Sequence, residues 1–282
     1  MHNIKAYVKQ LKPGFLGNFF FYCLPYRKKI VLANMRKVFK QDLTESEIKI
    51  LAKAFYRHIA KMLWETIMLR FLSTSAIKKR GVVIGYEKVL KAAEQHKGVL
   101  ILTGHFGSWE FAPIAGMLNF TQYKNHIYVV RKNITTKFIE KILFRRFYDA
   151  GLRVIPKKNS LHRVCEVLDQ NNAVLFVMDQ HASIKVKDGI MVDFFGEKAG
   201  TFRSLAMIAQ HTGVSVIPAC SYRRSDNQHV LRFYDPIPWE EGDDSKQTIA
   251  KNTLNYNKFL EKMILDHPDQ WLWMHRRWKK GH

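Results

Sequence analysis

From residue 81 onward, short apolar runs alternate with stretches of helical character. Five runs fit buried strands, at residues 82–84, 99–102, 127–130, 173–178 and 214–219. Helices are expected between most of them, near 86–95, 107–118, 135–150, 160–171 and 201–212. Strands that are apolar along their whole length need helices on both faces. The pattern predicts an α/β fold with a mixed, mostly parallel central sheet flanked by helices, and a hairpin turn is expected at 187–190.

Residues 1–80 differ from the rest because they are strongly basic and contain a long amphipathic helix. They hold 17 Lys or Arg against four Asp or Glu, which gives more than half of the net charge of +22 of this 282-residue chain. Thr44 and Glu47 have the spacing of a capping box, and apolar residues follow at helical steps as far as Ile67. We therefore divide the chain into an N-terminal basic helical, membrane-associating region, 1–80, and an α/β domain, 81–282.

A stripe of cations runs along this helix at every fourth residue: Lys49, Lys53, Arg57 and Lys61. It fits either a solvated face or a surface against anionic lipid, where each basic residue contributes about 1 kcal/mol. The apolar run at 15–24 is shorter than the roughly 20 residues that a membrane span needs, so it predicts an interfacial anchor. Basic residues follow it rather than a small-residue cleavage site, so no cleaved secretion signal is expected.

The cysteine content indicates the kind of compartment, and the net charge limits the classes of binding partner. Cys23, Cys165 and Cys220 are odd in number and widely spaced, so neither a disulfide framework nor a thiolate zinc site is expected, and a reducing compartment fits. The positive charge would attract phospholipid headgroups, nucleic acid or an acidic carrier protein. The chain has no helix-turn-helix, zinc-finger or RRM signature, which makes nucleic acid the weakest of these partners.

The residues best suited to chemistry follow the strand expected at 99–102. Gly104 and Gly107 permit a tight turn around His105, and Glu110 falls in the first turn of the next helix. Open α/β sheets bind ligands at strand ends of this kind. A general base needs an imidazole with one nitrogen toward the substrate and a carboxylate on the other. We predict that His105 is the base and that Glu110 orients it; the alternative is a structural histidine at a strand end.

Other catalytic patterns are absent from the sequence. There is no GxSxG elbow, P-loop or GxGxxG, so a serine hydrolase, a nucleoside triphosphatase and a Rossmann dehydrogenase have no support. His181 lies near Asp179, but two further ligands at suitable spacing are missing, so no metal site is predicted.

The segment 104–110 resembles the His, four residues, acid motif of the lysophospholipid acyltransferase superfamily, and specifically of the lipid A late acyltransferases (lauroyl and myristoyl transferases). Further blocks match in the same order and cover roughly residues 20–280. These matches are Arg131, Arg146, Asp179–Gln180, 194–196 with Thr201, and 273–279. The region that is usually a longer hydrophobic helix in this family is short here, which implies peripheral binding to the cytoplasmic face of the cell inner membrane.

The resemblance implies transfer of a fatty acyl chain from a thioester to a hydroxyl of a membrane glycolipid, a lipid A precursor, without metal or cofactor. It implies acyl carrier protein as donor and an anionic membrane surface as partner. The alternative is acyl-CoA with a glycerophospholipid or amino-acid lipid as acceptor. The implied catalytic residues are His105 and Glu110. The implied substrate-binding residues are Arg131, Arg146, Asp179, Gln180, Arg203, His275 and Arg276.

Each implied substrate-binding residue also has a structural alternative. Arg146 could hold a carbonyl oxygen or a phosphate, or could be a surface cation beside Arg145. Asp179 and Gln180 could line a pocket or cap a helix. The remaining arginines and His275 could bind a substrate phosphate or support the fold.

Overall fold

The computed structural model describes residues 4–131, 145–157, 160–185 and 189–279. Seven strands form the central sheet: β1 (Gly81–Ile84), β2 (Val99–Thr103), β3 (Ile127–Arg131), β4 (Leu152–Pro156), β5 (Ala173–Val177), β8 (Val216–Arg223) and β9 (His229–Phe233). Their order is β1-β9-β8-β2-β5-β3-β4, and every neighbouring pair is parallel except β8 and β9. This mixed, mostly parallel sheet confirms the predicted fold class.

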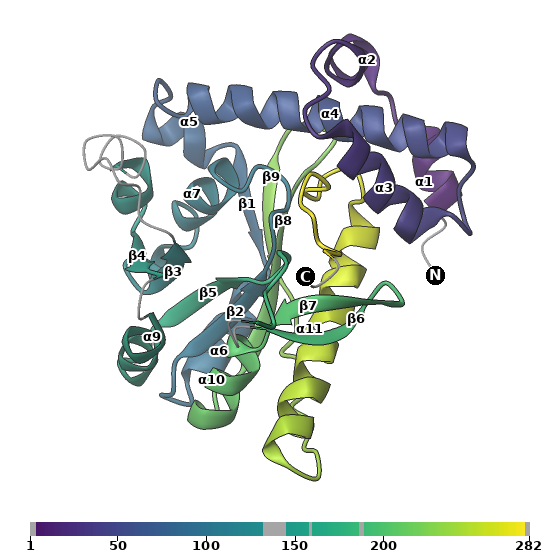
Figure 1. Ribbon diagram of the computed structural model, residues 1–282. Coiled ribbons are helices and arrows are strands. Elements are labelled where there is room, and N and C mark those ends of the chain that lie inside the picture. The colour runs from purple at the N-terminus through teal and green to yellow at the C-terminus, as the bar shows by residue number, and fades with distance from the viewer. Residues whose placement is uncertain (1–3, 132–144, 158–159, 186–188, 280–282) are drawn as a thin grey trace.

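The side chains of β2 show how the sheet divides the core. Leu100 and Leu102 point into one hydrophobic cluster, whereas Val99 and Ile101 point into another on the opposite face, as the two-residue period of a strand requires. Helices cover both faces, as Figure 1 shows. On the Val99 side lie α6 (Tyr86–Ala93) and α7 (Phe111–Met117), and on the Leu100 side lie α9 (Ser160–Asp169), α10 (Ser204–Thr212) and α11 (Ser245–Asp266).

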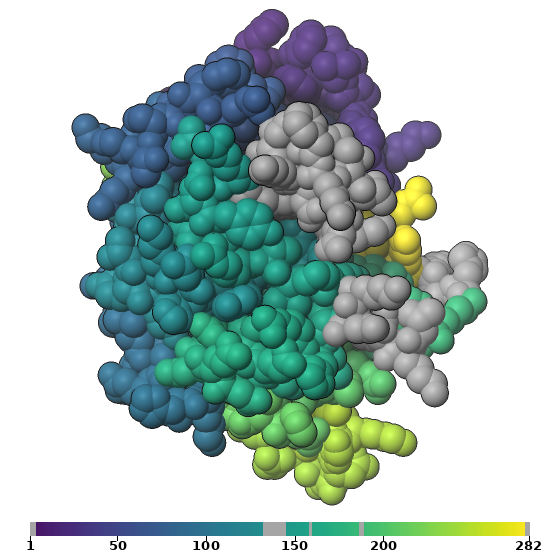
Figure 2. All heavy atoms as spheres, turned by 90° about the vertical axis from the view of Figure 1, so that its left-hand side faces the viewer, coloured from purple at the N-terminus to yellow at the C-terminus, as the bar shows by residue number. Residues whose placement is uncertain are grey.

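The N-terminal helices lie across one end of the sheet. They are α1 (Ile4–Gln10), α2 (Gly14–Tyr22), α3 (Lys28–Phe39), α4 (Glu45–Met68) and the short α5 (Thr74–Lys78). The predicted capping box is confirmed, because the Thr44 hydroxyl accepts from the Glu47 amide and the Glu47 carboxylate accepts from the Thr44 amide. Figure 1 shows α4 crossing the top of the molecule with α2 on its outer side. In Figure 2 the same helices again form the top, with α10 and α11 below.

The basic stripe on α4 is partly used to hold α2. The Arg57 guanidinium donates to the Lys12 carbonyl at 2.6 Å, and the Lys53 ammonium lies 4.8 Å from the centre of the Tyr22 ring. Gly17 permits the close approach of the two helices, since a Cβ there would lie 2.5 Å from the Lys53 carbonyl oxygen. The stripe is therefore neither wholly solvated nor wholly free to face a membrane.

Several expected boundaries are wrong. The helix expected at 107–118 begins only at Phe111, because the preceding residues form a turn. The helix expected at 201–212 begins at Ser204, since Glu197–Phe202 is β7, which pairs with β6 (Gly189–Phe194) in a separate hairpin. The turn of that hairpin lies at Phe195 and Gly196, both with positive φ.

Two expectations lie wholly or partly outside the described residues. Of the helix expected at 135–150, only 145–150 is described, and 145–149 is helical; of the turn expected at 187–190, only 189 and 190 are described, and they begin β6. The division at residue 80 stays a prediction.

Cys23, Cys165 and Cys220 are free thiols. Within the described part of the chain, no helix combines the length and the apolar character that crossing a membrane requires.

Candidate active site

The turn after β2 carries the candidate base. Thr103 ends the strand, and its hydroxyl donates to the Ala219 carbonyl at 2.7 Å, which ties the strand end to β8. Gly107 has a φ of 56°, and a Cβ there would lie 2.6 Å from the Ser221 carbonyl oxygen. Only glycine satisfies both the left-handed backbone and this close approach. The turn therefore lies tightly against β8.

A segment close to the C-terminus holds the same turn from the other side. The Leu272 amide donates to the His105 carbonyl at 3.1 Å, and the Gly107 amide donates to the Gln270 carbonyl at 2.9 Å. The two peptide groups that follow the candidate base thus have fixed partners. The backbone around His105 is held by residues more than 160 positions away in the chain.

Asp179, which follows β5, is the carboxylate that contacts His105. One carboxylate oxygen lies 2.9 Å from Nδ1 of the imidazole, and the other accepts from the His105 amide at 2.7 Å. The indole Nε1 of Trp271 donates to that second oxygen at 2.9 Å. The Asp179 residue is only 2% exposed, so all these contacts occur away from water. They fix both the ring and the backbone of His105.

The electrostatics of this pair define the tautomer. Burial alone would lower the pKa of the His105 imidazole, but the charge and hydrogen bond of Asp179, together with the charge of Glu110, raise it. Burial would raise the pKa of Asp179, yet the contacts with His105 and Trp271 lower it, so this carboxylate is ionised. An ionised carboxylate only accepts, so Nδ1 carries the proton and Nε2 is the basic nitrogen.

The expectation that Glu110 directly orients His105 is therefore wrong: Asp179 occupies that position. Glu110 lies at the N-cap of α7 rather than in its first turn, and its carboxylate accepts from the Arg131 guanidinium at 3.2 Å. α7 starts at Phe111, four residues later than the sequence suggests, and the Glu110 side chain is directed toward the end of β3, where Arg131 lies. The charge of Glu110 helps to raise the pKa of His105.

His105, Glu110 and Arg131 line a cavity of about 770 Å³. Most of its walls are apolar side chains from the sheet and from α7. They include Ile101, Pro113, Met117, Ile127, Val129, Phe147, Leu152, Leu175, Leu231 and Phe233. The cavity extends from the C-terminal end of β3, at Arg131, to its first residue, Ile127, which is about 13 Å at strand spacing. A long apolar chain that ends beside His105 fits this shape.

The other predicted site residues are distributed unevenly. Gln180 and Arg203 line the cavity, and Arg203 is also the N-cap residue of α10. Burial lowers the pKa of His275, and this residue is close enough to Asp179 and His105 for their charges to affect that pKa as well. The structure thus brings Arg131, Asp179, Gln180 and Arg203 together around His105.

Arg146 and Arg276 are not brought to the cavity. The Arg146 guanidinium donates to the Leu72 and Arg70 carbonyls, at 2.9 and 3.3 Å, and so joins its helix to the loop after α4. Arg276 is exposed. Its neighbour Arg277 is the buried arginine of the block, and it donates to the Gly200 carbonyl at 2.6 Å. Arg146 and Arg277 thus hold parts of the fold together, whereas Arg276 lies at the surface.

Three residues near His105 escaped prediction. Trp109 meets the imidazole edge to face, with ring centres 5.5 Å apart, and lines the cavity. Lys157 adds a cation to the lining. Trp271 donates to Asp179, and the only sequence signal for it was its place beside the 273–279 block. Among the described residues, no group of three or more His, Cys, Asp or Glu is arranged to hold a metal ion.

The chain is similar in sequence to known acyltransferases. A relative from Escherichia coli (strain K12), lipid A biosynthesis palmitoleoyltransferase, is 26% identical over 257 residues, which is 91% of this chain and 80% of that protein. Lipid A biosynthesis lauroyltransferase of the same strain is also 26% identical, over 90% of this chain and 79% of that protein. Phosphatidylinositol mannoside acyltransferase of Mycolicibacterium smegmatis is 21% identical over 70% of this chain and 62% of that protein.

Among solved structures, the 1-acyl-sn-glycerophosphate (LPA) acyltransferase PlsC from Thermotoga maritima aligns with 94% of this chain and 98% of its own, at 15% identity and a TM-score of 0.38. The sequence model of the family described as bacterial lipid A biosynthesis acyltransferase matches residues 10–280. With nearly the whole chain matched, this protein is an acyltransferase and belongs to the bacterial lipid A biosynthesis acyltransferase family.

Proposed function

We propose that this acyltransferase moves a fatty acyl chain from acyl carrier protein to a hydroxyl of a lipid A precursor, with His105 as general base. The observation that carries the proposal is the contact between His105 Nδ1 and Asp179, which leaves Nε2 as the basic nitrogen beside an apolar cavity. The names of the two E. coli relatives support the acceptor.

The reaction needs one proton acceptor and one proton donor. Nε2 of His105 removes the proton of the acceptor hydroxyl while its oxygen attacks the thioester carbonyl and forms a tetrahedral intermediate. When the C–S bond breaks, the imidazolium returns this proton to the departing thiolate. Such general-base assistance contributes about 10²–10⁴-fold in rate. Asp179 and Glu110 both favour the imidazolium that exists between the two steps.

The apolar cavity is the proposed place of the acyl chain. Each methylene that leaves water contributes about 0.8 kcal/mol, so a chain of a dozen carbons gains several kcal/mol from the walls alone. The thioester end then lies at the strand ends, beside His105. Arg131, Gln180 and Arg203 line the same cavity and supply donors for the carbonyl oxygen or for a phosphate of either substrate.

The N-terminal helices are the proposed membrane surface. Large apolar side chains are exposed on α2, on the C-terminal half of α4 and just after it: Phe15, Leu16, Phe19, Tyr22, Leu63, Trp64, Ile67 and Phe71. Exposed apolar groups beside cations suit a bilayer with anionic headgroups. We propose peripheral association with the cytoplasmic face of the inner membrane, where an acyl carrier protein thioester can reach the cavity.

The test is an acyl-transfer assay with the purified protein, a lipid A precursor in mixed vesicles, and either acyl carrier protein or coenzyme A as the acyl carrier. Mass spectrometry should show one acyl mass added to the precursor, and His105→Ala should remove this product. Glu110→Ala should reduce it strongly, because the imidazolium loses a nearby charge. Turnover with acyl-CoA alone would reject the carrier-protein donor, and acylation only of a phospholipid would reject the acceptor.

A further inference from the structure

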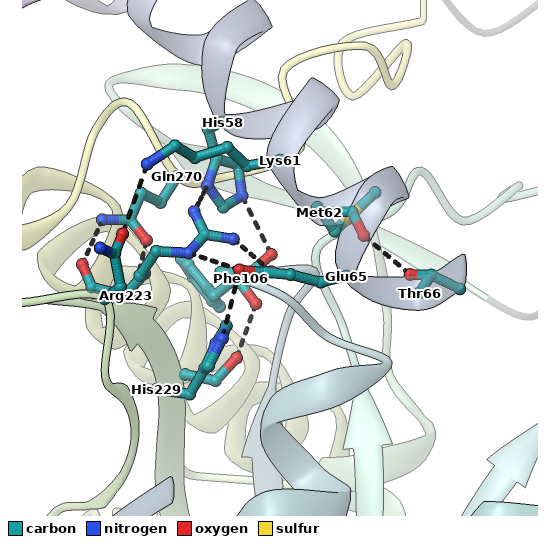
Figure 3. Close-up of polar contacts among 12 residues, drawn as sticks. His58, Lys61, Met62, Glu65, Thr66, Phe106, Arg223, His229 and Gln270 are labelled. Atoms are coloured by element: carbon teal, nitrogen blue, oxygen red, sulfur yellow. Dashed lines mark hydrogen bonds and ion pairs between the residues drawn. The ribbon is translucent and has the colours of Figure 1, made fainter. Parts of the chain in front are cut away.

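Behind the catalytic turn lies a buried polar cluster that the proposed reaction does not use (Figure 3). It consists of His58 and Glu65 from α4, Arg223 at the end of β8, and His229 at the start of β9. His58 is 4% exposed, and the Arg223 side chain 7%. Charges buried this deeply cost several kcal/mol unless every group is paired. The hydrogen bonds and ion pairs of these four residues therefore show which part of the fold the cluster holds in place.

Arg223 and Glu65 form the charged unit of the cluster. Nε of the guanidinium donates to Oε1 of the carboxylate at 2.9 Å, and Nη2 donates to Oε2. His229 Nε2 lies 3.3 Å from Oε1. Burial would raise the pKa of Glu65, but His229 and Arg223 lower it to about 2, so the carboxylate stays ionised. The guanidinium is thereby fixed with its remaining nitrogen, Nη1, directed at His58, as Figure 3 shows.

The direction of both hydrogen bonds of His58 follows from this arrangement. Burial and the nearby charge of Arg223 lower the pKa of His58 to about 3, so the ring is neutral. A guanidinium can only donate, so Nδ1 of His58 accepts from Arg223 Nη1 at 3.1 Å. The ring proton then lies on Nε2, which donates to the Gly107 carbonyl at 3.0 Å.

Gly107 is held by this cluster through both of its peptide groups. Its carbonyl accepts from His58, and its amide donates to the Gln270 carbonyl at 2.9 Å. The Gln270 side chain in turn accepts from the Arg223 amide at 2.8 Å and donates to the Arg223 carbonyl at 3.0 Å. Gly107 is two residues from His105, so the position of the catalytic ring depends on this one arginine and its partners.

We infer that His58 is a positioning residue: by accepting from Arg223 and donating to the Gly107 carbonyl, it fixes the turn that carries His105. This inference rests on the proposed role of His105. A general base that moves by about 1 Å loses on the order of 10²-fold in rate. His58 touches neither substrate nor the reacting atoms, and it acts only through the turn.

Two substitutions separate the hydrogen bonds of His58 from its volume. His58→Phe keeps a ring but loses both bonds, and kcat should fall by on the order of 10²-fold while KM for the acyl donor stays unchanged, because the cavity walls are untouched. His58→Gln keeps one acceptor and one donor, and it should recover most of kcat. The matched control is Asn252→Leu in α11, where another fully buried side chain bonds residues 240 and 248.

Hydrogen exchange, followed by mass spectrometry, tests the same inference without any substrate. Amides of residues 104–107 should exchange faster in His58→Phe than in wild type, and at the wild-type rate in His58→Gln and Asn252→Leu. Wild-type kcat in His58→Phe, unchanged exchange, or an equal loss of kcat in Asn252→Leu would each overturn the inference. Absence of acyl transfer by the wild type would instead overturn the proposed function and leave the exchange result to stand.

Discussion

Asp179→Asn is the substitution that most directly tests how His105 is held. One Asp179 oxygen accepts from two N–H groups, the His105 amide and the Trp271 indole, and the other faces Nδ1 of the imidazole. In asparagine, only a carbonyl oxygen can satisfy the two N–H groups, so the amide nitrogen must face Nδ1. It then donates to Nδ1, which moves the ring proton to Nε2 and removes the basic site.

The size of the effect follows from this change of tautomer. The equivalent Asp to Asn change in a serine protease triad lowers kcat by about 10⁴-fold, because the histidine takes the wrong tautomer. A loss of about 10³–10⁴-fold is expected here, which corresponds to about 4–5 kcal/mol in the barrier. Fold and membrane association should persist, because asparagine has nearly the same shape. Wild-type kcat in a folded Asp179→Asn protein would refute this account of the site.

The pH profile gives a second measurement. The base acts when neutral, so wild-type activity should fall as the pH drops through the raised pKa of His105, above its ordinary value of about 6.5. In Asp179→Asn, this acid limb should move to lower pH. The pair stabilises the fold fully only above the unfolded pKa of Asp, about 3.9, and below that of His, about 6.5. The melting temperature of the variant should therefore differ most from wild type within that window.

Other predictions concern the helices and the cavity. Gly17→Ala places a Cβ against the Lys53 carbonyl oxygen and should lower the free energy of unfolding by about 1–3 kcal/mol, measured by urea denaturation; an unchanged midpoint would contradict the packing of α2 on α4. Leu152→Trp fills the cavity near the start of β4 and should shift donor preference to shorter acyl chains in competition assays. The double variant Phe15→Glu with Trp64→Glu should bind anionic vesicles less in a sedimentation assay, at an unchanged melting temperature. Full binding would show that a different surface of the protein contacts the membrane.

The sheet could be predicted because its central strands are apolar along their whole length. β2 and β5 lie between helices on both faces, and every position except Thr103, at the end of β2, is hydrophobic, so the pattern is clear. By contrast, β7 contains Lys198 and Gly200, and its sequence does not alternate between apolar and polar residues. Short strands that contain an arginine, such as β4 with Arg153 and β9 with Arg232, leave the same weak signal.

Only part of the candidate site could be predicted from the sequence. The glycines around His105 and the strand before it pointed to this residue as the candidate base, because a tight turn has local sequence requirements. The carboxylate that holds the ring did not follow from spacing, since Asp179 is 74 residues away and is placed by the pairing of β2 with β5. The cluster around Arg223 was missed for the same reason: three elements, α4, β8 and β9, supply it, and no local pattern links them.

The hydrogen bonds from Gln270 and Leu272 to the turn have a consequence for biosynthesis. These residues leave the ribosome more than 160 positions after the histidine that they support. The last strand of the sheet, β9, ends at Phe233, so a nascent polypeptide can complete its sheet while its histidine still lacks this support. Competence for acyl transfer should therefore come only after residues 270–272 have been made and have docked on the turn.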